Sequence, residues 1–128
     1  MKEKKDLILS LRGSLPKSFA KKLPREVKLV EVSTQESGKL NLVYRGKKKA
    51  ANVLSFRYGP GYGEILVCPE IIRQEARKQG HSYKHQMTWM IVHGMIHLAG
   101  LHHENSRALA RKSELIERKI LGKISFDL

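Results

Sequence analysis

The stretch from Tyr83 to Gly100, YKHQMTWMIVHGMIHLAG, constrains the fold of this chain more than any other. It carries no formal charge after Lys84, and its apolar residues at 87, 90, 91, 95 and 98 are close to helical spacing. A helix with so few charges belongs in the interior, so we expect it to be the buried central helix. Gly100 is expected to end this helix, because glycine adopts the positive φ of a helix C-terminus without penalty.

Two histidines of this helix, His93 and His97, are four positions apart and therefore project from one face. His103 follows the Gly100 turn, which completes the pattern H-x3-H-x5-H. Three imidazoles with an open fourth position form the ligand set of a catalytic zinc site. His102 is a rival for the third ligand. The alternative for a bare pair is two core histidines bonded to carbonyl groups, and the third histidine counts against it.

The spacing of the three histidines and Gly100 is similar to that of the metzincin proteases, H-E-x-x-H-x-x-G-x-x-H. Gly94 stands where those peptidases have the glutamate that serves as general base. Glycine cannot accept a proton, so the pattern predicts a hydrolytic metal centre whose substrate is not a peptide. One Zn²⁺ per chain is expected, with another divalent metal as the alternative.

The net charge favours a polyanionic partner. Twenty-five Lys and Arg residues against twelve Asp and Glu give +13, an excess that favours nucleic acid first and an anionic membrane surface second. The alternative is a surface that is basic only for solubility. Because only 6% of the residues are aromatic, no platform that stacks several bases is expected.

Two further features bear on location. No apolar run approaches the roughly 18 to 20 residues that a membrane span needs, so no membrane span is predicted, and a membrane is not among the expected partners. The single cysteine, Cys68, cannot form an internal disulfide, which is typical of a reducing compartment. The sequence therefore predicts a cytoplasmic protein.

The remaining periodicities predict one α+β domain over residues 1–128, with a small mixed sheet of about four to five strands and three to four helices. The metal site is expected at the end of the buried central helix. Strands are expected at 6–12, 27–33, 52–57 and 64–68, and a further period of two at Leu40, Leu42 and Tyr44 after a turn at Ser37 and Gly38. Helices are expected at 17–23, 70–79 and 83–100, and from Asn105 or Ser106 to about Leu121.

The segment HGMIHLAGLHH closely resembles the signature H-G-x-L-H-L-x-G-y-D-H of the YbeY family of bacterial endoribonucleases, also called rRNA maturation factors. Residues 40–56, LNLVYRGKKKAANVLSF, are similar to the family's L-N-x-x-Y-R-x-K-D-x-P-T-D-V-L-S-F, and residues 63–70, GEILVCPE, to its G-D-I-V-I-C. Three departures stand out: His102 replaces Asp, Ala51 and Asn52 replace Thr-Asp, and Arg57 replaces Pro. Loss of the Asp would weaken the orientation of the metal site, although Glu104 keeps an acid beside the last histidine.

The resemblance implies a single-strand-specific, metal-dependent endoribonuclease that acts in 16S rRNA 3′ end maturation, rRNA processing and ribosome quality control. It implies single-stranded rRNA as substrate, and the ribosome or small-subunit proteins as partners. By match, His93, His97 and His103 are the zinc ligands, and Arg45 is the functional arginine. Two other functions stay open: a metallopeptidase-like hydrolase, and a non-catalytic ribosome- or RNA-binding factor that zinc stabilises.

Arg45 suits phosphate recognition, because a guanidinium group binds a phosphate through two parallel hydrogen bonds. Its alternative role is a surface salt bridge. Lys47, Lys48 and Lys49 follow it and would extend a phosphate track, or would form a solvated loop. Ser55 is expected to hydrogen-bond near the site or simply within its strand.

Overall fold

The computed structural model describes residues 2–100 and 107–123, and the side chains of residues 4–100, 111–112 and 114–122. These residues form an α+β fold with a three-stranded mixed sheet and six helices. The elements in chain order are α1 (Lys2–Ser14), α2 (Lys17–Ala20), β1 (Glu26–Glu31), α3 (Thr34–Arg45), β2 (Val53–Arg57), β3 (Tyr62–Val67), α4 (Pro69–Gln79), α5 (Tyr83–Leu98) and α6 (Arg107–Lys123).

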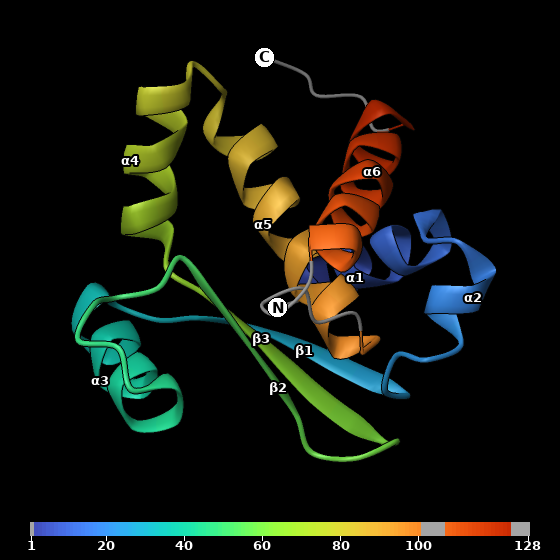
Figure 1. The fold of residues 1–128 in the computed structure, drawn as a ribbon, viewed down its shortest axis with the longest axis horizontal. Helices are drawn as coiled ribbons and strands as arrows, with labels where there is room; N and C mark the ends of the chain where they lie inside the picture. Colours follow the sequence, from blue (N-terminus) through green and yellow to red (C-terminus); the bar gives the residue numbers. More distant parts are fainter. Residues whose placement is uncertain (1, 101–106, 124–128) are drawn as a thin grey trace.

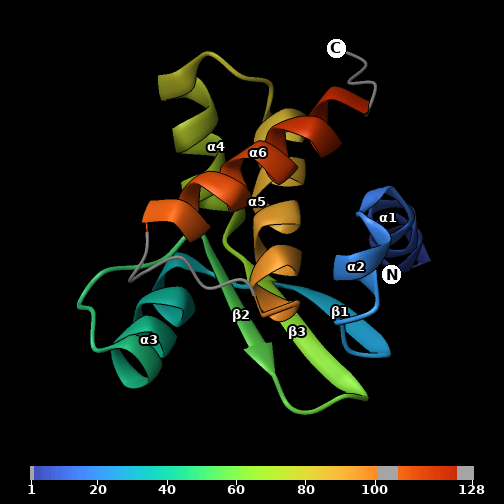
Figure 2. The same cartoon turned by 45° about the vertical axis from the view of Figure 1, so that its right-hand side comes forward.

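The sheet has the order β1-β3-β2, with β1 parallel and β2 antiparallel to the central strand. Helix α5 packs on β2 and β3, and α1 packs on β1 (Figure 1). Helix α3 lies at one end of the sheet, while α1 and α2 lie at the other, as the second view also shows (Figure 2). None of the described helices is long and apolar enough to cross a membrane.

The expected central helix is confirmed as α5. Its residues Ile91, Val92 and Ile96 are fully buried, and it contacts both α4 and α6. Gly100 adopts a φ of 94° two residues after the end of α5, and Gly80 adopts a φ of 71° directly after α4. Gly100 therefore ends a helix as the sequence predicts, and Gly80 ends α4 in the same way.

The strand expected at residues 6–12 is wrong, because this segment lies within helix α1. Ile8, Leu11 and Leu15 are buried, and their spacing of three and four places them on one helical face toward the core. In a half-buried strand Leu9 would lie on the same face as Leu11, but Leu9 is 65% exposed. The short apolar run was ambiguous in period, and packing on β1 resolved it in favour of the helix.

The extended segment expected at Leu40, Leu42 and Tyr44 is also wrong, and so is the turn expected at Ser37 and Gly38. All of these residues lie within helix α3. Ser33 starts this helix with a capping box: its hydroxyl accepts from the Glu36 backbone, and the Glu36 carboxylate accepts from the Ser33 backbone. Leu42 and Tyr44 are 48% and 65% exposed. Their alternation therefore does not mark a buried strand face.

These two corrections leave three strands rather than four or five, and six helices rather than three or four, among the described residues. The other expected strands are confirmed as β1, β2 and β3, and the expected helices as α2, α4, α5 and α6. Helix α2 covers only residues 17–20 of the predicted 17–23. The expected cap of the last helix, Asn105 or Ser106, lies outside the described residues.

Candidate metal centre

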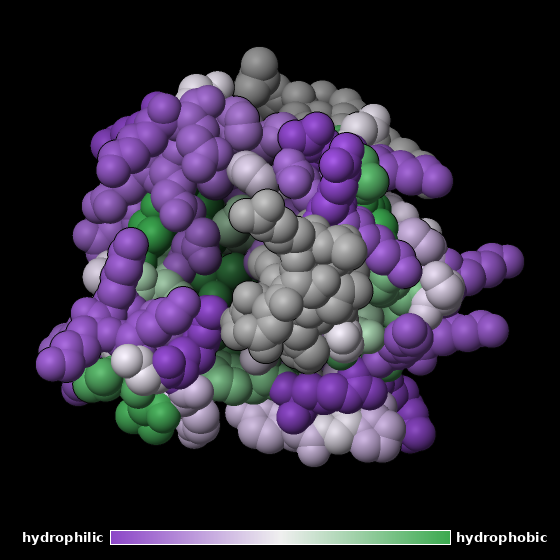
Figure 3. Space-filling view, in the orientation of Figure 1, coloured by the Kyte–Doolittle hydropathy of each residue, from purple (hydrophilic) through white to green (hydrophobic). Residues whose placement is uncertain are grey.

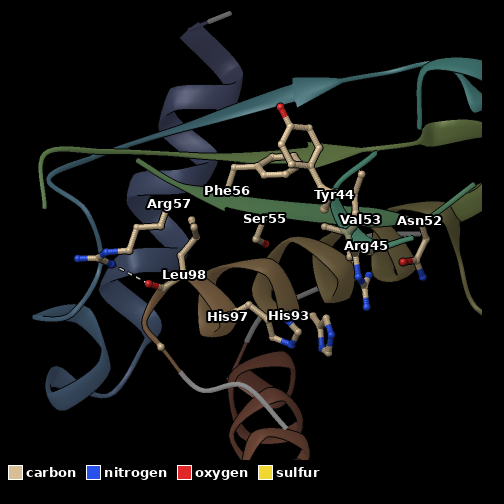
Figure 4. A pocket seen from close by; sticks show the side chains of 12 residues that line it. Tyr44, Arg45, Asn52, Val53, Ser55, Phe56, Arg57, His93, His97 and Leu98 are labelled. Atoms are coloured by element: carbon tan, nitrogen blue, oxygen red, sulfur yellow. Dashed lines mark hydrogen bonds between the residues drawn. The ribbon is translucent and has the colours of Figure 1, made fainter. Parts of the chain in front are cut away.

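A cleft of about 500 Å³ lies where the C-terminal half of α5 faces β2 and the end of α3. Its lining brings together the histidine pair and residues far from it in sequence, among them Arg45, Ser55, Arg57, His93 and His97. Figure 4 shows Arg45, Ser55 and the two histidines coming from three different elements around this space. The space-filling view, in the orientation of Figure 1, shows many hydrophilic side chains and a hollow with hydrophobic residues at its floor (Figure 3).

His93 and His97 lie side by side at the cleft, with ring centroids 4.4 Å apart and ring planes inclined by 45°. Both side chains are half-buried, so they are held in place while still facing solvent. The predicted third ligand, His103, and its rival His102 lie outside the described residues. Within the part of the chain that is described, no group of three or more metal-ligating side chains converges.

A buried carboxylate orients the first histidine. Oε2 of Glu117 lies 2.9 Å from Nδ1 of His93, and Oε1 accepts a hydrogen bond of 2.7 Å from Nε1 of Trp89. A carboxylate acceptor at Nδ1 favours the tautomer that carries its proton there, which is the form in which Nε2 ligates a metal ion. The donor chemistry of this site therefore fits zinc, for which imidazole nitrogen is a preferred ligand.

The sequence analysis missed Glu117. It lies on α6 and is only 5% exposed, although glutamate is rarely buried without a partner. One signal could have found it: Glu117 lies three residues before the buried Ile120, on the apolar stripe of an amphipathic helix. An acidic side chain on such a stripe needs a hydrogen-bonding partner in the core, and here Trp89 and His93 are such partners.

Close packing against the sheet explains why position 94 holds a glycine. A Cβ atom at this position would lie 2.9 Å from Cγ2 of Ile65, 3.0 Å from Oγ of Ser55 and 3.3 Å from Cγ2 of Val53. Ser55 also donates a hydrogen bond of 3.0 Å to the Gly94 carbonyl. Position 94 therefore faces the sheet, and glycine allows α5 to approach it closely enough to hold both histidines at the edge of β2.

Arg45 is the last residue of α3, and buried polar residues of this helix hold the chain that leads back to β2. Asn41 donates to the Lys49 carbonyl over 2.6 Å, and Ser37 donates to the Ala51 carbonyl over the same distance. Gly46 ends the helix with a φ of 68°. These contacts fix the position of Arg45 relative to the cleft that it lines.

The lysines at 47, 48 and 49 are exposed on the connection from α3 to β2, next to the cleft rather than in its lining. Ser55, for which two roles were open, bonds to the backbone of α5 at the cleft. None of the described residues that line the cleft is an Asp or a Glu. The described lining therefore combines two arginines and two histidines without a carboxylate, an arrangement that favours an anionic ligand.

Two departures from the family pattern have partners in this structure. Asn52 donates from Nδ2 to the Glu75 carboxylate, at 3.0 Å and 3.3 Å from its two oxygens, where an Asp would repel that carboxylate. Arg57 donates to the carbonyl oxygens of Lys22 and Leu98, each over 2.7 Å. Arg57 therefore ties the end of α5, next to His97, to the edge of β2.

The chain is similar to known proteins of one family. The profile of the family described as "Endoribonuclease YbeY" matches residues 2–125. A protein named "Endoribonuclease YbeY" from Bdellovibrio bacteriovorus is 38% identical over 93 residues, which cover 71% of this chain and 62% of that protein. Its namesake from Bartonella henselae is 37% identical over 109 residues, covering 78% of this chain and 68% of the relative. The match thus spans less than two thirds of the first relative.

Among solved structures, the solution structure of TM1509 from Thermotoga maritima has a TM-score of 0.59 to this chain, with 27% sequence identity. The match covers 92% of this chain and 83% of the other.

Proposed function

Since this chain belongs to the YbeY family of endoribonucleases, we propose that it is a metal-dependent endoribonuclease that hydrolyses single-stranded RNA. The observation that carries the proposal is the cleft itself: His93, His97 and Arg45 line one space, and no described lining residue is acidic. An RNA phosphate is attracted to such a surface, and the net charge of +13 extends the attraction over the whole molecule.

His93 and His97, with His103 as the third ligand, would hold one Zn²⁺ or another divalent metal. When bound, the ion supplies positive charge that polarises a phosphoryl oxygen and makes water more acidic. Glu117 keeps the His93 ring in the ligating tautomer. Arg45 binds the phosphate oxygens through two hydrogen bonds and neutralises charge that develops there. Lys47, Lys48 and Lys49 bind neighbouring phosphates of the strand.

The biological role that we propose follows the family. The substrate is rRNA, the reaction belongs to 16S rRNA 3′ end maturation and ribosome quality control, and small-subunit proteins are the partners. The proposed location is the cytoplasm. One domain carries the whole activity.

Metal content is the first test. We would measure zinc by mass spectrometry in tag-free wild-type protein and in His93→Ala, His97→Ala, His102→Ala and His103→Ala. About one zinc per chain is expected in the wild type and in the His102 variant, with loss in the other three. No stoichiometric metal in any folded sample would overturn the metal-dependent mechanism.

RNA cleavage is the second test. A labelled single-stranded RNA should be cut by the wild type, and cutting should be lost in the three zinc-free variants. Double-stranded RNA of the same sequence is the control and should stay intact. RNA binding without cleavage in a zinc-loaded wild type would contradict the enzyme and support a non-catalytic RNA-binding factor. Cleavage of casein that is lost in His93→Ala would support a peptidase instead.

A further inference from the structure

The sheet turns an aromatic surface away from α5. Ser55 points toward α5, where its hydroxyl bonds to the Gly94 carbonyl, and successive strand residues point to opposite faces. Phe56 therefore points to the other face, which Figure 4 shows for its ring and for the ring of Tyr44 beside it. Tyr58 and Tyr62 lie on the same face as Phe56, at the end of the β2–β3 hairpin, where the Tyr58 backbone donates to the Tyr62 carbonyl.

We call this set the aromatic row; its members are Tyr44, Phe56, Tyr58 and Tyr62. The rings meet in two pairs. Tyr44 and Phe56 have centroids 5.0 Å apart in an edge-to-face arrangement, and Tyr58 and Tyr62 are stacked at 5.7 Å with planes inclined by 28°. Low aromatic content did not indicate such a surface, because the rings come from separate segments of the chain.

Glu64 holds the second pair in place. Its carboxylate accepts hydrogen bonds from the hydroxyls of Tyr58 and Tyr62, over 3.0 Å and 2.8 Å. Phe56 pairs with Glu64 across the two strands, so this carboxylate lies in the middle of the row. Because both hydroxyls are already bonded and the two rings stack on each other, the outer ring faces are the surface that remains for a ligand. Rings that are fixed in advance lose little conformational entropy when a ligand binds.

One ring of each pair in the aromatic row is exposed to solvent. Tyr44 and Tyr58 are each 65% exposed, and Phe56 and Tyr62 are half-buried. A group of large, partly exposed side chains in contact with one another is a candidate binding surface. A planar ring with a free face binds another planar ring by stacking.

The row begins at the metal centre. Tyr44 and Phe56 line the same cleft as His93 and His97. Tyr44 and Arg45 are consecutive residues, and Figure 4 shows Arg45 extending to the side of β2 where His93 lies, whereas Tyr44 lies on the other side. A strand whose phosphate is bound at Arg45 would thus have its neighbouring base next to Tyr44.

We propose that the aromatic row is a nucleobase subsite, on which unpaired bases next to the cut phosphate stack. This inference rests on the proposed function and adds to it how the substrate is recognised. Single-strand binders stack successive bases on aromatic side chains beside a basic groove, and ring faces accept every base. A duplex keeps its bases inside the helix, so it offers none to the row. The subsite therefore explains a preference for single strands without a preference for sequence.

Binding of paired oligonucleotides tests the subsite. We would compare an adenine decamer with a decamer of the same number of phosphates that is abasic throughout, both single-stranded and dye-labelled. Affinities would be measured by fluorescence anisotropy with the full-length protein at one salt concentration, and electrophoresis would confirm that the decamers stay intact. The wild type is expected to bind the adenine decamer about tenfold more tightly than the abasic one.

Single variants locate the effect. Tyr44→Ala and Tyr58→Ala should each lose most of the tenfold preference by weakening only adenine-decamer binding, while abasic-decamer affinity stays unchanged. Tyr44→Phe keeps the ring and should keep the preference. Leu9→Ala is the matched control, because Leu9 is also 65% exposed but lies on α1; it should change neither affinity.

The outcomes separate this inference from the proposed function. Equal affinity of the wild type for the two decamers would overturn the nucleobase subsite alone and leave the face to a protein partner. Equal weakening of both decamers in the Ala variants would also overturn it, because the loss would then not involve bases. A wild type that binds neither decamer and cuts no RNA would overturn the proposed function as well.

Discussion

Glu117 and His93 form a hydrogen bond of 2.9 Å between Oε2 and Nδ1 that joins α6 to the helix carrying the candidate metal ligands. The other carboxylate oxygen accepts from Trp89, which lies one helical turn before His93. Both oxygens of one buried side chain are therefore engaged by donors of α5. Helix α6 thus contributes directly to the geometry of the candidate metal centre.

We expect Glu117→Gln to lower zinc affinity by about 10- to 100-fold, because an amide has only one acceptor oxygen for two donors. The measurement is competition for zinc against a chelator of known affinity. Glu114→Gln, at an exposed position of the same helix, is the control and should bind zinc like the wild type. Unchanged zinc affinity in folded Glu117→Gln would contradict the orienting role.

We expect Gly94→Ala to lower the free energy of unfolding by about 1 kcal/mol. The added methyl group meets Ile65 and Ser55 at 2.9 Å and 3.0 Å, and overpacking costs about 1 to 3 kcal/mol, of which better helix propensity offsets about 1 kcal/mol. Urea unfolding measures the change. Gly13→Ala in α1, where a Cβ meets no atom within 4 Å, should not be destabilising. A Gly94→Ala protein as stable as the wild type would refute the packing argument.

We expect Arg45→Lys to lower kcat/KM for single-stranded RNA by about tenfold or more, although it preserves the charge. Lysine replaces a planar fork of donors with one ammonium group, so the two parallel hydrogen bonds to phosphate are lost. Lys48→Ala is the comparison, because it removes one charge beside the cleft. It should reduce the slope of log binding constant against log salt concentration by about one. Full activity of Arg45→Lys would show that charge alone suffices at this position.

We expect the two tyrosines bonded to Glu64 to ionise at a higher pH than an ordinary tyrosine. The hydrogen bond to Glu64 is the main cause that raises the pKa of Tyr62 to about 12, and it raises the pKa of Tyr58 as well. A raised pKa means that the folded state binds the phenol proton more tightly than the unfolded state does. The hydrogen bond therefore stabilises the fold fully below about pH 10, and this stabilisation is lost as the pH rises toward 12. Absorbance at the phenolate band during alkaline titration follows all four tyrosines, and the difference from a Glu64→Leu variant gives these two ionisations.

Glu64→Leu supplies the comparison for that titration, because leucine removes both the hydrogen bonds and the charge. The two tyrosines should then ionise nearer to the ordinary tyrosine pKa of about 10. A titration curve identical to that of the wild type would mean that Glu64 does not hold the rings. The nucleobase subsite would then lack its fixed geometry, although the rings themselves would remain exposed.

We expect Ser33→Ala to lower the free energy of unfolding by about 1 kcal/mol, since Ser33 satisfies a backbone donor in the first turn of α3. Thermal unfolding followed by circular dichroism measures this loss. Ser33→Asp is the control that keeps a capping side chain and should retain most of the stability. An unchanged stability of Ser33→Ala would mean that the hydrogen bonds of Ser37 and Asn41 alone hold this helix.

Some features follow from the local sequence because they depend only on backbone geometry. An uncharged apolar stretch predicts α5, and residues four apart on a helix share a face, so the pairing of His93 and His97 follows from their spacing alone. Gly80 and Gly100 could be identified as helix ends for the same reason. The family signature added Arg45, which the fold places in the cleft with the histidines.

Other features needed the folded chain. Residues 6–12 are too short and too apolar for their period to distinguish a strand from a helix, and contact with β1 decided it. At residues 40–44 apolar residues recur at every second position as in a strand, but the capping box of Ser33 starts a helix that includes them. His103 lies outside the described residues, so the third ligand stays a prediction.

The sequence by itself determined the helix, the histidine pair and the basic charge, because period, spacing and composition are properties of neighbouring residues. Only the tertiary structure decided that Glu117, 24 residues after His93, orients it. It likewise decided that Gly94 faces the sheet and that four aromatic rings from different segments gather on one face. The physical reason is that such contacts depend on how elements pack, and no local pattern specifies which distant side chains packing will bring together.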